Sequence, residues 1–199
     1  MRSGILREAY DYWIGPLSGP DYFPNDRAAI WFERSDTTDN FIREAFGPDL
    51  DLVGTADWPL ANLTREERVG LVIFLDQFPR NIFRETPAAF AYDSRAREIA
   101  GALLEHNRTG YHPVELVFLA LPFEHSEALA DQDRSVRLME ELVAALPGGD
   151  PFYASALGYA RKHRDLILRF HRFPHRNAVL GRTSTPAEEA FLKEHGRGY

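Results

Sequence analysis

Apolar side chains recur every three or four residues along most of the chain, which is the spacing of amphipathic helices. Residues 4–14 show this pattern with Ile5, Leu6, Tyr10 and Trp13, and Gly15 with Pro16 ends the run. No stretch alternates apolar and polar residues with the β-branched enrichment of a strand. The pattern predicts an all-α fold of about nine helices joined by short connections.

The other helices are predicted from the same spacing and from turn residues. We expect helices over residues 26–34, 38–46, 64–78, 86–106, 112–121, 130–146, 151–170 and 185–195, and a long connector over residues 48–63. Capping boxes open two of them, at Thr64 with Glu67 and at Thr185 with Glu188. Pro79 and Pro122 are expected to end the helices before them. The length of 199 residues fits a single domain over residues 1–199.

A polar corner between helices occurs twice. Phe78-Pro79-Arg80-Asn81 recurs as Phe173-Pro174-His175-Arg176-Asn177. Each copy is followed by a further arginine, Arg84 or Arg182, and by a Thr-Pro-Ala helix start. We call these segments the first corner and the second corner. They show where polar side chains concentrate.

The composition narrows the class of protein. Hydrophobic residues make up 44% and charged residues 27%, as in ordinary soluble globular proteins. The longest apolar run, residues 69–75, is far too short to span a membrane, and the start of the chain lacks the apolar core of a signal peptide. The absence of cysteine excludes disulfides and thiolate metal sites. We therefore expect a cytoplasmic protein.

Charge is unevenly distributed. The net charge of −7 disfavours nucleic-acid binding. Lysines and arginines are nevertheless interleaved with aromatic residues over residues 161–182, as they are in RNA-binding segments. That segment carries seven lysines and arginines against one acid, whereas residues 115–150 carry eight acids and two arginines. Either the two segments pair with each other, or one of them receives a charged ligand.

Three polar clusters lie at helix ends. They comprise Asp76, Gln77, Arg80, Asn81 and Arg84; Glu124, His125, Ser126 and Glu127; and His171, Arg172, His175, Arg176, Asn177 and Arg182. Arginine forks bind carboxylates and phosphates bidentately, and the helix starts after Thr86 and Thr185 add free amides. This predicts an anion site. The alternative is structural: the arginines cap helix carbonyls and pair with the acids of the other clusters.

Histidine beside carboxylates is suited to proton transfer, so His125, Glu127 and His175 are the candidate catalytic residues. A metal is not expected, because Glu-His-x-Glu does not place two ligands on one helix face and would need His163, Asp165 or His175 from elsewhere. No cofactor is expected either, because the dinucleotide, phosphate-loop and Gly-x-Ser-x-Gly motifs are missing.

Three motifs carry a resemblance to a known family: residues 75–84, residues 121–127 with Asp131 and Gln132, and residues 172–182. Together they resemble the bacterial family catalogued as domain of unknown function 924. The resemblance implies an all-α fold related to tetratricopeptide (TPR) helical hairpins and brings no established activity. His171 departs from the family pattern, which has glycine there, either for a tight turn or to leave room for a ligand.

Two functions follow from these observations. The first is binding or turnover of a small anionic compound, a phosphate or a carboxylate, in a cleft lined by both corners. Its candidate ligand-binding residues are Asp76, Gln77, Arg80, Asn81, Arg84, Glu124, Arg172, Arg176, Asn177 and Arg182. The second is a TPR-like protein-interaction scaffold that binds an acidic peptide or a partner protein.

Overall fold

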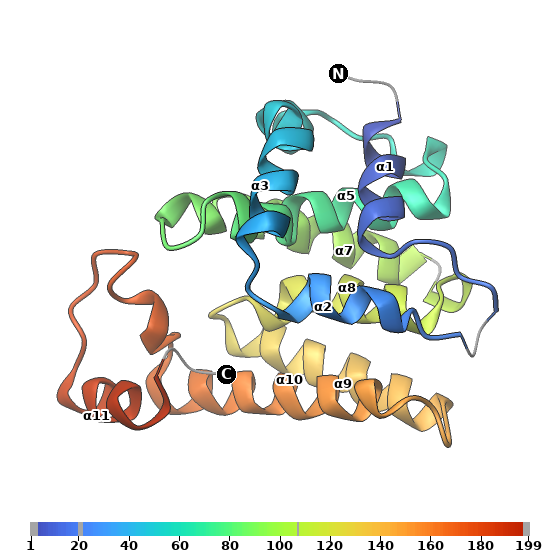
Figure 1. The fold of residues 1–199 in the computed structure, drawn as a ribbon. Helices are drawn as coiled ribbons and strands as arrows, with labels where there is room; N and C mark the ends of the chain where they lie inside the picture. Colours follow the sequence, from blue (N-terminus) through green and yellow to red (C-terminus); the bar gives the residue numbers. More distant parts are fainter. Residues whose placement is uncertain (1–3, 20–21, 107, 197–199) are drawn as a thin grey trace. The chain divides into compact units, whose positions relative to one another are not determined.

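The computed structural model of the protein describes residues 4–19, 22–106 and 108–196. All regular structure in these ranges is helical, which confirms the predicted all-α fold (Figure 1). No helix among the described residues combines the length and the hydropathy needed to cross a membrane. The chain divides into two compact units: unit 1 comprises Met1–Arg84 and Ala88–Pro122, and unit 2 comprises Glu85–Pro87 and Phe123–Tyr199. The single-domain organisation stays a prediction.

Unit 1 is organised around one buried helix. Its helices are α1 (Ile5–Trp13), α2 (Ala28–Phe32), α3 (Asp36–Ala45), α4 (Leu50–Thr55), α5 (Arg65–Asp76), α6 (Phe78–Ile82), α7 (Asp93–His106) and most of α8 (Pro113–Glu124). Helix α5 packs against α1, α4, α6 and α7 (Figure 1). Every α5 residue from Val69 to Asp76 is buried, so the apolar run seen in the sequence forms the centre of this unit.

Helices α1 and α5 approach each other closely at Gly70. A Cβ atom at this position would lie 2.0 Å from the carbonyl oxygen of Leu6, so only glycine fits here.

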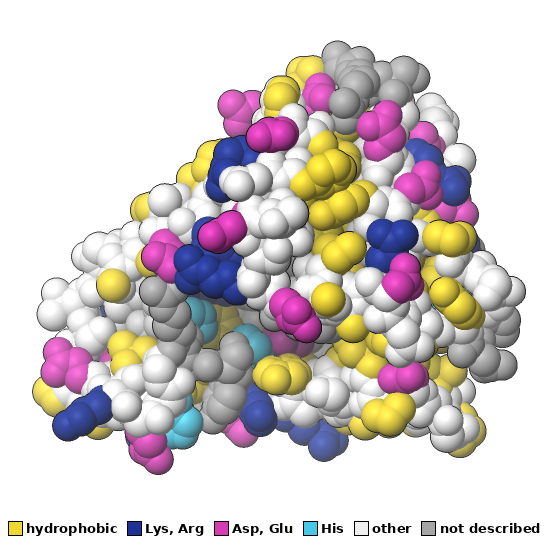
Figure 2. Space-filling view, viewed as in Figure 1, with side chains coloured by type: hydrophobic (Ala, Val, Ile, Leu, Met, Phe, Trp, Pro, Cys, Tyr) yellow, Lys and Arg dark blue, Asp and Glu magenta, His cyan; other side chains and the backbone are white. Residues whose placement is uncertain are grey.

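Hydrophobic side chains also reach the surface between α1 and α3 (Figure 2). There the ring of Tyr12 stacks on Phe41, which is 48% exposed, with the ring centroids 4.6 Å apart.

Unit 2 consists of a helical hairpin and a shorter helix. Helices α9 (Leu129–Ala145) and α10 (Pro151–Phe170) lie side by side, and α11 (Pro186–His195) follows the second corner (Figure 1). Leu166, Ile167, Phe173 and Phe191 form a hydrophobic core between the end of α10, the corner and α11. The second corner therefore contributes Phe173 to the core of this unit, next to its polar side chains.

Several local predictions are confirmed by the backbone. Both capping boxes form, with Thr64 accepting from the amide of Glu67 and Thr185 accepting from the amide of Glu188. Helix α10 has the expected bounds, and the side chain of Asp150 caps its first turn. The expected helix over residues 86–106 begins with a 3-10 turn, and its α-helical part starts at Asp93.

Two predictions about helix breaks were wrong, and a third was confirmed. The expected connector over residues 48–63 contains α4, because Leu50 and Val53 are buried and the ring of Tyr92 packs over Gly54. The helix before Pro79 ends as expected, at Asp76, and Pro79 itself lies in the first turn of α6, where proline needs no amide donor. Pro122 lies inside α8, which continues to Glu124; in the last turn proline costs only one helical hydrogen bond.

Candidate functional site

In the first corner, Arg80 is held by carboxylates of unit 1. Its Nη1 and Nη2 lie 2.8 and 2.9 Å from the two carboxylate oxygens of Asp93, and Nη1 lies 3.5 Å from Asp76. Asp76 is buried at the end of α5 and also accepts from Gln77. Burial alone lowers the pKa of Arg80, but the two carboxylates outweigh it and raise this pKa. The guanidinium is therefore matched by the protein itself.

Arg84 has a similar environment. Its Nε and Nη2 each lie 2.7 Å from an oxygen of Asp39, and Asn81 Nδ2 donates to the same carboxylate over 2.8 Å. Burial raises the pKa of Asp39, but hydrogen bonds from Arg84 and Asn81 outweigh that effect and lower it. The first corner thus has the geometry that the structural alternative predicts. Asp39 and Asp93 had not been assigned any role from the sequence.

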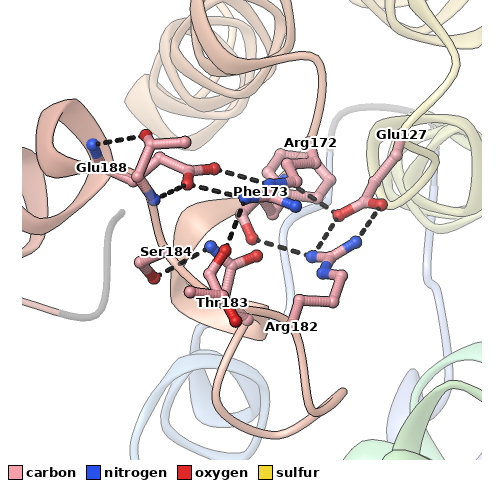
Figure 3. A network of polar contacts seen from close by, with 9 residues as sticks. Glu127, Arg172, Phe173, Arg182, Thr183, Ser184 and Glu188 are labelled. Atoms are coloured by element: carbon pink, nitrogen blue, oxygen red, sulfur yellow. Dashed lines mark hydrogen bonds and ion pairs between the residues drawn. The ribbon is translucent and has the colours of Figure 1, made fainter.

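In the second corner, Glu127 and Arg182 hold the backbone of Phe173 (Figure 3). Arg182 Nη1 and Nη2 lie 2.7 and 2.9 Å from the carboxylate of Glu127, and Nη2 also donates to the Phe173 carbonyl over 3.2 Å. The Phe173 amide donates to Glu127 over 2.8 Å. Although burial raises it, the pKa of Glu127 is lowered by Arg182 and by this amide. Glu127, a candidate catalytic residue, therefore has a clear structural task.

A second bridge joins the corner to α11. Arg172 lies 2.6 and 2.7 Å from the two oxygens of Glu188, which also accepts from the amide of Thr185 over 2.7 Å (Figure 3). This pairing lowers the pKa of Glu188 to about 2. Asn177 Nδ2 donates to Ser184 Oγ over 3.0 Å. Like Arg182, Arg172 is matched by a carboxylate of the protein.

A cluster of histidines surrounds the buried ring of Phe173. The rings of His163 and His175 lie 5.5 and 5.4 Å from this ring, and the guanidinium of Arg176 lies 4.5 Å above its centroid. Arg176 Nη1 also donates to the carbonyl of His125 over 3.0 Å. We call His125, His163 and His175, with Glu124 and Arg176, the histidine cluster. All five belong to unit 2.

Within this cluster, the geometry fixes the tautomer of His163. Its Nδ1 lies 2.9 Å from the carbonyl of Tyr159, which can only accept, so Nδ1 carries the proton and donates to it; Glu124 Oε1 lies 3.1 Å from the same nitrogen. In the neutral ring, Nε2 is then the proton acceptor. Burial, together with the nearby His125, Arg176 and Lys162, lowers the pKa of His163 to about 4. The ring is therefore neutral at pH 7, with Nε2 as its proton acceptor.

His175 has the same charge state for a related reason. Burial, the charge of Arg176 and the proximity of His163 lower its pKa to about 4. Its Nδ1 is buried without a hydrogen-bond partner among the described residues. Other buried atoms of unit 2 share this property, among them Gln132 Oε1, Ser135 Oγ, Asn177 Oδ1 and Arg182 Nε. Buried polar atoms usually find a partner, so this unit offers donors and acceptors to a bound water or small molecule.

The sequence had singled out His163 only as a conditional metal ligand. A stronger signal was its place on the apolar face of α10, three residues from both Ala160 and Leu166, which are buried. A histidine on such a face is partly buried and electrostatically perturbed. Within the described ranges, no three histidine, aspartate or glutamate side chains are placed to hold a metal ion.

The predicted site residues thus form two groups. Those of the first corner interact with one another and with other residues of unit 1, whereas Glu124, His125 and Glu127 come together with the second corner in unit 2. The cleft lined by both corners stays a prediction. His171 ends α10 in the left-handed conformation, with φ 59° and ψ 11°. Glycine adopts this conformation readily, so the tight turn accounts for the glycine that the family pattern has at this position.

Comparisons with known proteins show which family the chain belongs to. The model of the family described as "Bacterial protein of unknown function (DUF924)" matches residues 9–196. The chain belongs to this family. A solved structure of a protein of unknown function from Agrobacterium tumefaciens, 30% identical in sequence, is similar to it with a TM-score of 0.73; the alignment covers 96% of this chain and 98% of the other. No protein with a curated description matches the chain.

Proposed function

We propose that this DUF924 protein binds a small anionic compound, a phosphate or a carboxylate, at the histidine cluster of unit 2 and moves a proton there. One observation carries the proposal: two half-buried imidazoles lie beside the guanidinium of Arg176, around a single buried ring. Arg80, Arg84, Arg172 and Arg182 hold carboxylates of the protein, so we take the histidines as the centre of the proposed site.

The roles within the site follow from the contacts. Arg176 supplies positive charge for the anion, and its stacking on Phe173 fixes the direction of the guanidinium. His163 accepts the proton at Nε2, because Nδ1 donates to the carbonyl of Tyr159. His175 offers the buried Nδ1 as a second polar contact. Hydrolysis or group transfer on the bound compound needs these functions, namely charge neutralisation and a base.

The test measures binding directly. Unfolding temperature is followed with inorganic phosphate, adenosine monophosphate, glucose 6-phosphate and succinate, and any hit is titrated by calorimetry. A ligand at about ten times its Kd should raise Tm by about 4 °C. Arg176→Gln and His175→Asn should each weaken binding at least about tenfold, the range of a lost charge-assisted contact.

Arg169→Gln is the matched control, since it removes the same charge from an exposed position near the end of α10. It should bind like the unaltered protein. If no anion in the panel binds, or if Arg169→Gln weakens binding as much as Arg176→Gln, the proposal is wrong.

The alternative is a TPR-like scaffold for an acidic peptide or partner protein. It is favoured by the hairpin of α9 and α10, which borders a cavity of about 420 Å³ that includes Arg137, Arg161 and Arg164. Arg161 and Arg164 are already paired with Glu140 and Asp133, over 2.8 and 2.5 Å, so this groove has less charge to offer a peptide. Fluorescence anisotropy with labelled poly-glutamate peptides tests it: binding that Arg137→Gln abolishes would support the scaffold.

With either function we propose a cytoplasmic location, in keeping with the cysteine-free sequence.

A further inference from the structure

Unit 1 contains a separate cavity that neither corner explains. It has a volume of about 370 Å³, within the range of small-molecule sites. Leu60 and Ala61 line it from the turn before α5, and Ala102 and Leu103 line it from α7. These walls are apolar.

Arg68 on α5 contributes a permanent positive charge to this cavity, which His106 at the end of α7 also lines. Its Nε donates to the carbonyl of Leu60 over 2.8 Å, and Nη2 donates to the carbonyl of Ala61 over 3.3 Å. Tyr111 also lines the cavity; burial raises the pKa of its hydroxyl, and the nearby guanidinium of Arg68 opposes this rise. All of these partners are neutral. Among the described residues, no carboxylate lies within ion-pair distance of this guanidinium.

This arrangement differs from that of the other arginines in unit 1 that line its polar clusters. Arg80 and Arg84 each hold a carboxylate of the protein bidentately. Arg68 is half-buried, held in one orientation by two carbonyls, and left with an unbalanced positive charge beside apolar walls. A charge in such surroundings is best stabilised by an opposite charge.

We propose that this cavity binds a small carboxylate with an apolar body, such as a medium-chain fatty acid or an arylalkanoic acid. The carboxylate contacts Arg68 and the hydroxyl of Tyr111. The hydrocarbon body packs against Leu60, Ala102 and Leu103. The site is independent of the histidine cluster, because all of its residues belong to unit 1.

Octanoate and 4-phenylbutyrate are the probes, and 1-octanol and 4-phenylbutanol are the matched neutral compounds. Binding is measured by calorimetry and by amide chemical shifts in two-dimensional NMR. The acids should bind at least about tenfold more tightly than the alcohols, the value of one charge-assisted hydrogen bond. The largest shifts should fall at Leu103 and Tyr111.

Three variants locate the site. Arg68→Gln should weaken acid binding at least about tenfold and leave alcohol binding unchanged. Ala102→Phe should abolish binding of both, because Ala102 is exposed and a larger side chain fills the cavity without entering the core. Arg95→Gln removes a charge from the same helix as Ala102, outside the cavity lining, and should change nothing.

The results separate the proposal from its competitors. Equal affinity for acids and alcohols, unaffected by Arg68→Gln, would show a purely apolar cavity and overturn the proposal. No binding of either class, or binding that survives Ala102→Phe, would also overturn it. Because Arg68→Gln removes two carbonyl contacts, the fold of each variant is confirmed from its NMR spectrum; Ala102→Phe decides the question if Arg68→Gln does not fold.

Discussion

At the residue scale, His171 shows how one position can carry backbone strain. It ends α10 at φ 59°, a conformation that is unfavourable for residues with a Cβ atom and natural for glycine. Its side chain is exposed, so little packing depends on it. We expect His171→Gly to raise the free energy of unfolding by about 1 kcal/mol, measured by urea denaturation. His171→Ala is the control: it retains a Cβ atom and should show no comparable gain. A destabilised His171→Gly would mean that the side chain matters.

The half-buried histidines of unit 2 make stability depend on pH. The pKa values of His163 and His175 are lowered to about 4 in the folded protein, whereas the unfolded chain takes up these protons near pH 6.5. Between these values the unfolded state binds more protons, so acid favours unfolding. The free energy of unfolding should therefore fall as pH decreases from about 6.5 to 4, by on the order of 3 kcal/mol for one histidine.

The paired carboxylates act in a lower window. The pKa of Glu188 is lowered to about 2, so its contribution to stability is lost only below about pH 4.5.

His163→Gln should flatten the stability profile between pH 6.5 and 4.5, whereas His106→Asn, which alters an exposed histidine of α7, should leave it unchanged. Urea denaturation at a series of pH values measures both. An imidazole of His163 that titrates near pH 6.5 by NMR would contradict this account.

At the element scale, two glycines on different helices should respond in opposite directions to the same substitution. Gly158 lies within α10, and a Cβ atom there would meet nothing within 4 Å. Gly158→Ala should stabilise the protein by about 1 kcal/mol through helix propensity. Gly70→Ala should destabilise it by about 1–3 kcal/mol, because the new methyl group would push α5 away from the backbone of Leu6. Thermal unfolding of both variants checks the pair, and a stabilised Gly70→Ala would disprove the close approach.

The difference between local signals and contacts made by the tertiary fold explains which features could be predicted from the sequence. Capping boxes and apolar spacing act within a few residues, so the ends of α10 and the start of α11 were predictable. Helix α4 was missed because its Gly54 is covered by Tyr92, a contact made by packing. The polar clusters were found, but their partners were not: Arg84 and Asp39 are 45 residues apart, and Arg182 and Glu127 are 55 apart. Such pairs depend on the tertiary fold and leave no local signal.

At the scale of the whole molecule, the open question is whether the two units unfold together. The sequence predicted one domain, and the tryptophans make this testable, because Trp13, Trp31 and Trp58 all belong to unit 1. Phe191 is 3% exposed and belongs to the core of unit 2. Phe191→Ala should destabilise that core by about 3–5 kcal/mol.

If the chain is one cooperative domain, Phe191→Ala will lower the urea midpoint of the tryptophan fluorescence as much as that of the far-ultraviolet circular dichroism. This is the outcome we expect, since the chain has the length of an ordinary single domain. Ile42→Ala, in the core of unit 1, is the positive control and should shift both signals in either case. A tryptophan transition that stays in place while the dichroism splits into two steps would show two independently stable units. In that case, changes in stability caused by variants of the histidine cluster would report on unit 2 alone.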